Sequence, residues 1–439
     1  MSPDMQNGKR ILVLGGGGRE HAIVRAIAQS PLVSHVFAAP GNAGIALEPK
    51  CGTFSRVAAD DIDAVLALAW QQHIGFIIPG SETPLVAGIA DAVANDGPLA
   101  RWCRVFGPNA RASMITEGSK CDAKAFMARH EIPTAPFECF SNMESARPFI
   151  LGHNLPMVVK ADGLAGGKGV RVCETSDEAV AFAEIQLRKH GRIVVEEFLA
   201  GEELTFTCMV VNGEVLPLAE SQDRKMFNGK MTGGVGAYSP VPFADAALRE
   251  RIMRQIVYPT VSGLKGEGVR YTGFLYFGLM IVNGEPFLLE YNCRLGDPEA
   301  QVILPRFRGN FLELITDALN GRLPSPKAIA SLWDKRAAVS VVLMDRDYPN
   351  EPPDGYPSYQ IQGLEIACKM PGIQIFHANT AIAKSRVTTN GGRVLGLTAL
   401  GVTLEEAVKR VYAAAEKIQW PGMQYCPDIG RVSPAVIAP

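Results

Sequence analysis

The chain has 439 residues, of which 47% are hydrophobic and 20% are charged, as in an ordinary globular protein. A chain of this length exceeds what one hydrophobic core holds, so two to four domains are expected. The net charge of −2 and the absence of an uncharged apolar run of about 18 residues exclude a basic nucleic-acid surface and a transmembrane helix, so neither nucleic acid nor membrane is an expected partner.

Strand and helix patterns alternate through residues 1–107. The pattern predicts strands and helices in alternation, at residues 10–14, 19–30, 36–39, 60–72 and 76–78. This order is typical of a doubly wound parallel sheet, whose ligands bind at the carboxyl ends of the strands. The glycine turn Gly15–Gly18 opens a helix and therefore indicates an anion site. A dinucleotide fold is the alternative, but the turn lacks the third glycine and no acidic residue ends the second strand.

Residues 108–327 have a different pattern, which predicts two antiparallel sheets facing each other. A helix after Gly118 carries Lys120 and Lys124 on one face. Residues from about 124 to 198 then read as a small α+β unit, and later strands form the second sheet. The segment 324–326, Pro-Ser-Pro, reads as a linker. Residues 328–439 alternate short strands with Gly/Pro turns and end in a helix, which predicts a small mixed α/β domain.

Two lysines near a glycine-rich loop indicate a phosphate site. Lys160 ends an apolar strand, and Lys168 follows eight residues later in a loop that includes Gly166 and Gly167. Ammonium groups and exposed amides neutralise a triphosphate, although the loop is not a P-loop. The run Val195–Leu199, with Glu196, Glu197 and Phe198 inside it, suits an adenine edge, and Glu203 suits a ribose. Each feature alone has a purely structural alternative.

A second constellation lies where a late apolar strand ends. Glu290 and Asn292 are two residues apart, so both side chains point to the same face of the strand. Carboxylate and amide oxygens suit Mg²⁺, whose remaining ligands come from nucleotide phosphates. Arg294, Asp297 and Glu299 follow directly. The alternative is a polar strand end with solvated charges.

In this order the motifs resemble the ATP-grasp superfamily and, within it, the phosphoribosylamine–glycine ligase family. The matching stretches cover nearly the whole chain: residues 17–21, 39–44, 160–165, 195–199, 233–240, 271–276, 292–299 and 389–395. The resemblance implies a multidomain α/β and α+β protein with central ATP-grasp domains, acting as an ADP-forming ligase. In that reaction ATP converts a carboxylate into an acyl phosphate, and an amine then displaces the phosphate.

The resemblance also implies residue roles. Phosphate and adenosine contacts fall on Lys120, Lys160, Gly166, Gly167, Lys168, Glu196, Glu197, Phe198, Leu199 and Glu203. Glu290 and Asn292 hold Mg²⁺, or Mn²⁺ in its place. Asp223, Lys225 and Arg294 lie at the reacting groups, with Arg294 binding the substrate carboxylate bidentately. Substrate contacts fall on Gly17, Gly18, Asn42, Gly44, Arg294, Asp297, Gly391, Gly392 and Arg393.

The implied substrates are an amino acid, glycine, and a phosphorylated sugar amine, 5-phosphoribosylamine. A monomer or homodimer is expected. The nine cysteines are scattered, odd in number and without Cys-x-x-Cys spacing, and no signal-peptide apolar region follows the N-terminus, so reduced thiols and a cytoplasmic location are expected.

Three stretches depart from the family pattern. The loop 226–231 is short and apolar where the family has a longer polar loop, residues 188–192 are shortened, and Gly80–Pro84 replaces Gly-Pro-Glu-x-Pro. Two alternatives therefore stand beside the family reaction. One is a paralogue that joins a different carboxylate and amine, and the other is an inactive regulatory protein that still binds nucleotide.

Overall fold

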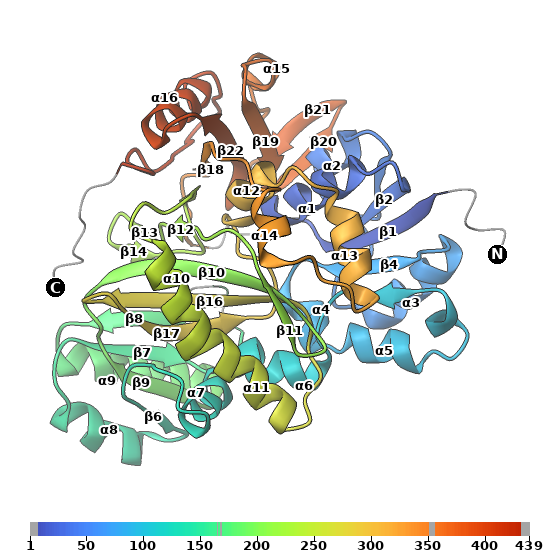
Figure 1. Cartoon of the computed structure of the whole chain (residues 1–439). Coiled ribbons are helices and arrows are strands. Elements are labelled where there is room, and N and C mark those ends of the chain that lie inside the picture. The colour runs from blue at the N-terminus through green and yellow to red at the C-terminus, as the bar shows by residue number, and fades with distance from the viewer. Residues whose placement is uncertain (1–7, 165, 167–168, 351–355, 432–439) are drawn as a thin grey trace.

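The computed structural model describes residues 8–164, 166, 169–350 and 356–431 (Figure 1). Gly167 and Lys168, two of the predicted phosphate-binding residues, lie outside this range. The mixed α/β multidomain architecture predicted from the sequence is confirmed, with a parallel sheet at the N-terminus, two sheets in the middle and a further sheet at the C-terminus. Among the described residues, no helix has both the length and the apolar character needed to cross a membrane.

The N-terminal sheet is parallel throughout. Its strands are β1 (Lys9–Gly15), β2 (Val33–Pro40), β3 (Cys51–Thr53), β4 (Phe76–Pro79) and β5 (Arg104–Val105), in the order β3-β2-β1-β4-β5. Most residues of β1 and all of β4 are buried, as expected for strands covered on both faces by helices. The helices include α1 (Gly18–Ala28), α2 (Ala43–Leu47), α3 (Ile62–Gln71), α4 (Glu82–Val86) and α5 (Ile89–Asn95). The strand order reverses between β1 and β4, which places a ligand crevice at the ends of these two strands.

Two antiparallel sheets face each other in the middle of the molecule. The smaller sheet has the order β6-β9-β7-β8, with β6 (Phe137–Phe140), β7 (Met157–Ala161), β8 (Val170–Cys173) and β9 (Ile193–Glu197). Helices α8 (Met143–Gly152) and α9 (Ser176–His190) pack on it, and α7 (Lys120–Arg129) leads into it. The larger sheet has the order β11-β10-β16-β17, with β10 (Glu202–Val211), β11 (Glu214–Pro217), β16 (Thr272–Val282) and β17 (Glu285–Asn292). Helices α10 (Ala246–Ile252) and α11 (Tyr258–Gly266) pack against the larger sheet.

The C-terminal sheet draws strands from two separate parts of the chain. Strands β18 (Ala337–Met344), β19 (Ile373–His377) and β22 (Arg393–Gly401) are joined by β12 (Gln222–Asp223) and β15 (Gly236–Ser239), in the order β12-β15-β18-β22-β19. Helix α16 (Leu404–Ala415) covers it. The hydrogen bonds between β15 and β18 therefore connect residues on the two sides of the predicted domain boundary at residue 328. The positions of this and the other domain boundaries stay predictions.

Short elements complete the middle and the C-terminal part. They are α12 (Ala300–Ile303), α13 (Phe311–Leu319), α14 (Pro326–Ala330), α15 (Leu364–Cys368) and the hairpins β13 (Met226–Phe227) with β14 (Lys230–Met231) and β20 (Thr380–Ala383) with β21 (Arg386–Thr389).

A buried polar cluster fastens β19 to the N-terminal helices. Nε2 of His21 lies 3.0 Å from the carboxylate of Glu48, which also contacts Arg25. The His377 amide donates to Nδ1 of His21 at 2.8 Å, and Asn42 donates to the His377 carbonyl at 2.8 Å. Burial lowers the pKa of His21 and lowers that of His377 to about 3, with nearby His21 and Arg25 adding to the effect on His377. Both imidazoles are therefore neutral at pH 7.

This cluster predicts that the protein loses stability in mild acid. The unfolded chain protonates His377 near pH 6.5, whereas the folded chain does so near pH 3, so between these values each fall of one pH unit costs about 1.4 kcal/mol from this residue. Urea unfolding from pH 7 to pH 4 measures the effect. We expect His377→Gln to have a shallower pH dependence than the wild type. His35→Gln, at an exposed position, serves as the control and should follow the wild type. Equal slopes for all three proteins would contradict the prediction.

Candidate active site

A β-bulge shapes the end of β17. Gly278 pairs with Glu290 and Leu279 pairs with Leu288, so Leu289 is an extra residue in this strand. The Leu289 carbonyl accepts a hydrogen bond from the ammonium of Lys160 at 3.3 Å. Bulges often occur beside active sites because they re-aim the neighbouring side chains. The bulge thus brings the lysine of the smaller sheet next to the residue that precedes Glu290.

Three carboxylates surround the ammonium of Lys225. Its Nζ lies 3.6 Å from Glu203, 3.8 Å from Glu290 and 4.0 Å from Asp223. Burial raises the pKa of Glu290, but Lys225, Lys160 and Lys120 outweigh it, so the net pKa lies below the ordinary value and the carboxylate is ionised. The resulting set of charges joins β10, β12 and β17 with Lys160 of β7 and Lys120 of α7.

The donor set at Glu290 fits a divalent cation bound together with phosphates. Its oxygens are hard ligands of the kind that Mg²⁺ prefers, and its side chain is 33% exposed, so it is accessible. In the described part of the chain, no group of three His, Cys, Asp or Glu side chains is arranged to hold a metal alone. A cation at Glu290 and Asn292 would therefore need further oxygens, of the kind that nucleotide phosphates offer.

The predicted adenosine-binding run, Val195–Leu199, begins inside β9 and extends past its end. The Glu196 carboxylate is buried and contacts both Lys124 and Lys160, so these ammonium groups take up its charge. Glu197, Phe198, Leu199 and Glu203 are partly exposed and remain candidates for nucleotide contacts.

Two further predicted phosphate-site residues lie on neighbouring segments. The ammonium of Lys120 donates to the Gly163 carbonyl at 2.9 Å, which places this lysine beside the glycine-rich loop. Gly166 has φ +55°, in the left-handed region that favours glycine. Both residues are therefore consistent with a loop that approaches the nucleotide phosphates.

Arg294 is held by two carboxylates from the N-terminal part of the chain. Its guanidinium donates to Glu117 at 2.7 Å, to Glu82 at 3.2 Å and to Oδ1 of Asn292 at 2.9 Å. Burial alone would raise the pKa of Glu82, but Arg294 and Arg19 outweigh burial, so the pKa falls to about 2. The predicted bidentate contact with a substrate carboxylate would require Arg294 to release one of these partners.

Glu117 was not among the residues predicted from the sequence. It lies in one turn of π-helix, Met114–Gly118, and its carboxylate accepts hydrogen bonds from Arg294 and from the Cys293 amide at 2.8 Å. Burial raises its pKa, although Arg294 opposes the shift. Such π-turns are frequent at functional sites, but their position is not visible in a sequence pattern. Only the folded chain identifies Glu117 as part of the site.

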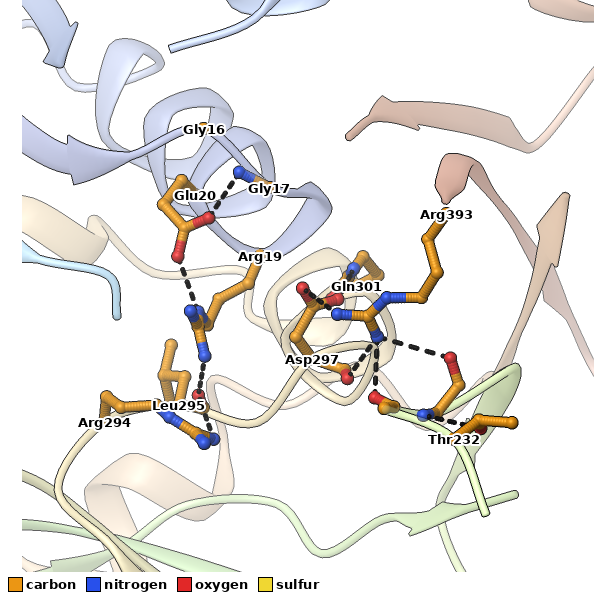
Figure 2. A network of polar contacts seen from close by, with 12 residues as sticks. Gly16, Gly17, Arg19, Glu20, Thr232, Arg294, Leu295, Asp297, Gln301 and Arg393 are labelled. Carbon is orange, nitrogen blue, oxygen red and sulfur yellow. Dashed lines mark hydrogen bonds and ion pairs between the residues drawn. The ribbon is translucent and has the colours of Figure 1, made fainter. Parts of the chain in front are cut away.

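The carboxylate of Glu20 occupies part of the glycine turn after β1. Figure 2 shows Glu20 turned back to accept a hydrogen bond from the Gly17 amide at 2.6 Å, while Arg19 donates to Glu20 at 2.6 Å and to the Leu295 carbonyl at 3.3 Å. A Cβ atom at Gly15 or Gly80 would lie within 2.6 Å of the Glu20 side chain. Glu20 therefore occupies one amide of the predicted anion site and explains why glycines surround it.

Arg393 fastens the loops on the other side of Figure 2. Its guanidinium pairs with Asp297 at 3.0 Å and donates to the Gly233 carbonyl at 2.7 Å. Gln301 donates to the other Asp297 oxygen at 2.7 Å. A Cβ atom on Gly18 would lie 2.6 Å from the Gln301 amide nitrogen, so this glycine permits the close approach of α1. The predicted substrate residues Gly18, Asp297 and Arg393 are thus brought together.

The remaining predicted substrate residues lie around the same interface. Asn42 caps α2 and donates to the Gly16 carbonyl at 2.9 Å. Gly44 packs against the rings of His21 and His377, and a Cβ atom there would lie 2.4 Å from His377. Gly391 and Gly392 precede β22 with φ of +78° and +67°. Their place next to Arg393 keeps them near the loop of Asp297.

Most of the chain matches one family. Its residues 9–116, 118–300 and 338–432 match the N domain, the ATP-grasp (A) domain and the C domain of phosphoribosylglycinamide synthetase. It is 44% identical to the phosphoribosylamine–glycine ligase of Pasteurella multocida over 431 residues, which cover 96% of this chain and 97% of that protein. The phosphoribosylamine–glycine ligase of Salmonella typhimurium is also 44% identical, and the match covers 96% of this chain and 98% of that protein.

A solved structure extends the match to three dimensions. The crystal structure of phosphoribosylamine–glycine ligase from Thermotoga maritima has a TM-score of 0.78 and 32% identity, covering 95% of this chain and 99% of that one. The family indicated by the motifs is confirmed, and the chain belongs to the phosphoribosylglycinamide synthetase family.

Proposed function

We propose that this chain joins glycine to 5-phosphoribosylamine, forming an amide and converting ATP to ADP and phosphate. The observation that carries the proposal is the contact of Lys160 with the bulged Leu289 carbonyl, directly before Glu290. This contact supports the proposal because it brings Lys160 of the smaller sheet next to the residue that precedes Glu290, one of the two proposed oxygen donors of β17. A triphosphate and its metal ion need charges of both signs arranged in this way.

ATP and Mg²⁺ are the cofactors of this reaction. Glu290 and Asn292 would hold the ion, and Mn²⁺ would suit the same oxygens. When bound, the ion offsets charge on the phosphate oxygens. Lys120 and Lys160 neutralise the phosphates, and Lys225 lies where Asp223 and Glu290 approach each other. The chain thus binds and orients the reacting groups, and its lysines add to the charge compensation.

The shortened loop bears on the paralogue alternative. It forms the hairpin of β13 and β14, turned by Asn228 and Gly229 at φ +50° and +71°, as in a type I′ turn. Phe227 packs against the core of the C-terminal sheet. The loop is therefore a compact two-stranded element, and Lys225, directly before it, keeps its contacts with the acidic groups. These features favour the family reaction over a ligase for another acid and amine.

An inactive nucleotide-binding protein is disfavoured because Lys160, Glu290 and Asn292 are all in place. The partners are the small molecules glycine and phosphoribosylamine. We propose further that the protein works in the cytoplasm as a monomer or homodimer, with no nucleic acid and no membrane as partner.

Purified protein tests the function directly. With Mg²⁺ and ATP, we expect ADP release only when glycine and 5-phosphoribosylamine are both present, with the amide product detected by mass spectrometry. Omitting either substrate is the matched control. Turnover that requires a different acid or amine would support the paralogue instead. ATP binding without turnover by any substrate pair would support the inactive protein.

A further inference from the structure

A buried lysine to which the proposed reaction assigns no task lies behind the phosphate-facing lysines. Lys124 is 2% exposed, and its ammonium is 2.5 Å from Oε2 of Glu196. The other Glu196 oxygen contacts the ammonium of Lys160. Glu196 is also 2% exposed, so one carboxylate lies in the interior between two ammonium groups.

Neutral contacts hold Lys124 in this position. Its ammonium donates to the Thr134 hydroxyl at 2.6 Å, and that hydroxyl donates to the Leu288 carbonyl at 2.6 Å. Lys160 donates to the next carbonyl of the same strand, that of Leu289. The network therefore connects α7, β7 and β9 to β17, the strand that carries Glu290.

The net charge of Lys124, Glu196 and Lys160 indicates a role for Lys124. A buried carboxylate needs a cationic partner, and a single ammonium group paired with it forms a neutral unit. If Lys160 were the sole partner of Glu196, its charge would be cancelled before any ligand arrived. Burial raises the pKa of Glu196, yet Lys160 and Lys124 together bring it below the ordinary value, so the carboxylate is ionised. With both lysines charged, the group of three retains one positive charge.

We propose that Lys124 is a positioning residue, which takes up the charge of Glu196 and so leaves the Lys160 ammonium available to the triphosphate of ATP. The inference rests on the proposed function, in which Lys160 meets the nucleotide phosphates. Lys124 itself does not touch the nucleotide in this arrangement. Its effect on binding passes through Glu196.

Calorimetric titration of the full chain with Mg²⁺ and ATP tests the proposal. Lys124→Met is expected to raise the Kd for ATP by about tenfold, because Lys160 then becomes the sole partner of Glu196 and is less available to the phosphates. In steady-state assays the KM for ATP rises and the KM for glycine stays unchanged. Arg129→Met removes an exposed charge from the same helix and is the control, with an unchanged Kd.

A double-mutant cycle separates this role from a merely structural one. In a Glu196→Gln background there is no carboxylate to neutralise, so Lys124→Met is expected to change the Kd by less than about threefold. Equal losses in both backgrounds would overturn the proposal, as would an unchanged Kd for Lys124→Met. If Lys124→Met does not fold, Lys124→Arg keeps the charge and should bind ATP within about threefold of wild type, and a larger loss would count against the proposal.

The proposed function and this inference fail in different ways. Wild-type protein that binds ATP but does not ligate glycine and phosphoribosylamine contradicts the function alone. Wild-type ligation with no coupling between Lys124 and Glu196 contradicts the inference alone.

Discussion

Glu290→Ala is expected to lower glycine- and phosphoribosylamine-dependent ADP release by roughly a thousandfold, the upper range for loss of one preorganised electrostatic group. Glu290 supplies the carboxylate of the predicted metal pair, and its pKa lies below the ordinary value because Lys225, Lys160 and Lys120 outweigh the effect of burial. Its removal leaves the ion with the Asn292 oxygen alone from this pair. Steady-state rates across a Mg²⁺ titration measure the loss.

Glu285→Ala is the matched control for this variant. Glu285 lies at the opposite end of β17, is 55% exposed and contacts only Arg251 at 3.9 Å among its ion pairs in the described residues. The same substitution there should leave turnover and the Mg²⁺ dependence unchanged. Wild-type turnover by Glu290→Ala at ordinary Mg²⁺ concentrations would remove the metal assignment.

Arg294→Met is expected to destabilise the protein by about 3–5 kcal/mol and to abolish ligation, because one largely buried guanidinium, 16% exposed, neutralises two carboxylates. Its contacts with Glu82 and Glu117 join the segment after β17 to the N-terminal part of the chain, and the Glu117 side chain is only 8% exposed. Without Arg294, both carboxylates lose their cationic partner. Urea unfolding measures the stability, and ADP release measures the activity.

A second substitution separates the two effects of Arg294. Arg294→Met combined with Glu117→Gln removes one of the stranded charges, so part of the lost stability should return while ligation stays abolished. Arg294→Lys is a further comparison, because an ammonium group cannot reproduce the fork that reaches both carboxylates. Normal stability and normal ligation in Arg294→Met would show that the two carboxylates do not depend on this residue.

The parts of the fold with strong local patterns could be predicted from the sequence. Alternating apolar strands and helices indicated the parallel sheet, and the long apolar strands that became β10, β16 and β17 indicated the second central sheet. Strands β12 and β15 were missed as members of the C-terminal sheet. They have two and four residues, too few to show a periodic pattern. Strand β12 pairs with β15, and β18, the other partner of β15, lies about a hundred residues later.

Only those site residues that residue type and spacing along the chain identify could be predicted from the sequence. Glu290 and Asn292 follow from alternation along one strand, but the bulge at Leu289 depends on pairing with β16. Glu117 and Glu20 were missed because their partners, Arg294 and the turn at Gly17, are recognised only in the folded chain. The engagement of Glu196 by Lys124 likewise arises from contacts between elements that are separate in sequence.

The strand exchange at β15 has a consequence for dissecting this molecule. Because β15 hydrogen-bonds to β18, a fragment cut near residue 327 would carry an unpaired strand edge that invites aggregation. The complementary fragment would keep β18 and lose the neighbour that shields it. The segment after residue 327 is therefore not an independent folding unit. The parts of the chain before and after this residue are best expressed together.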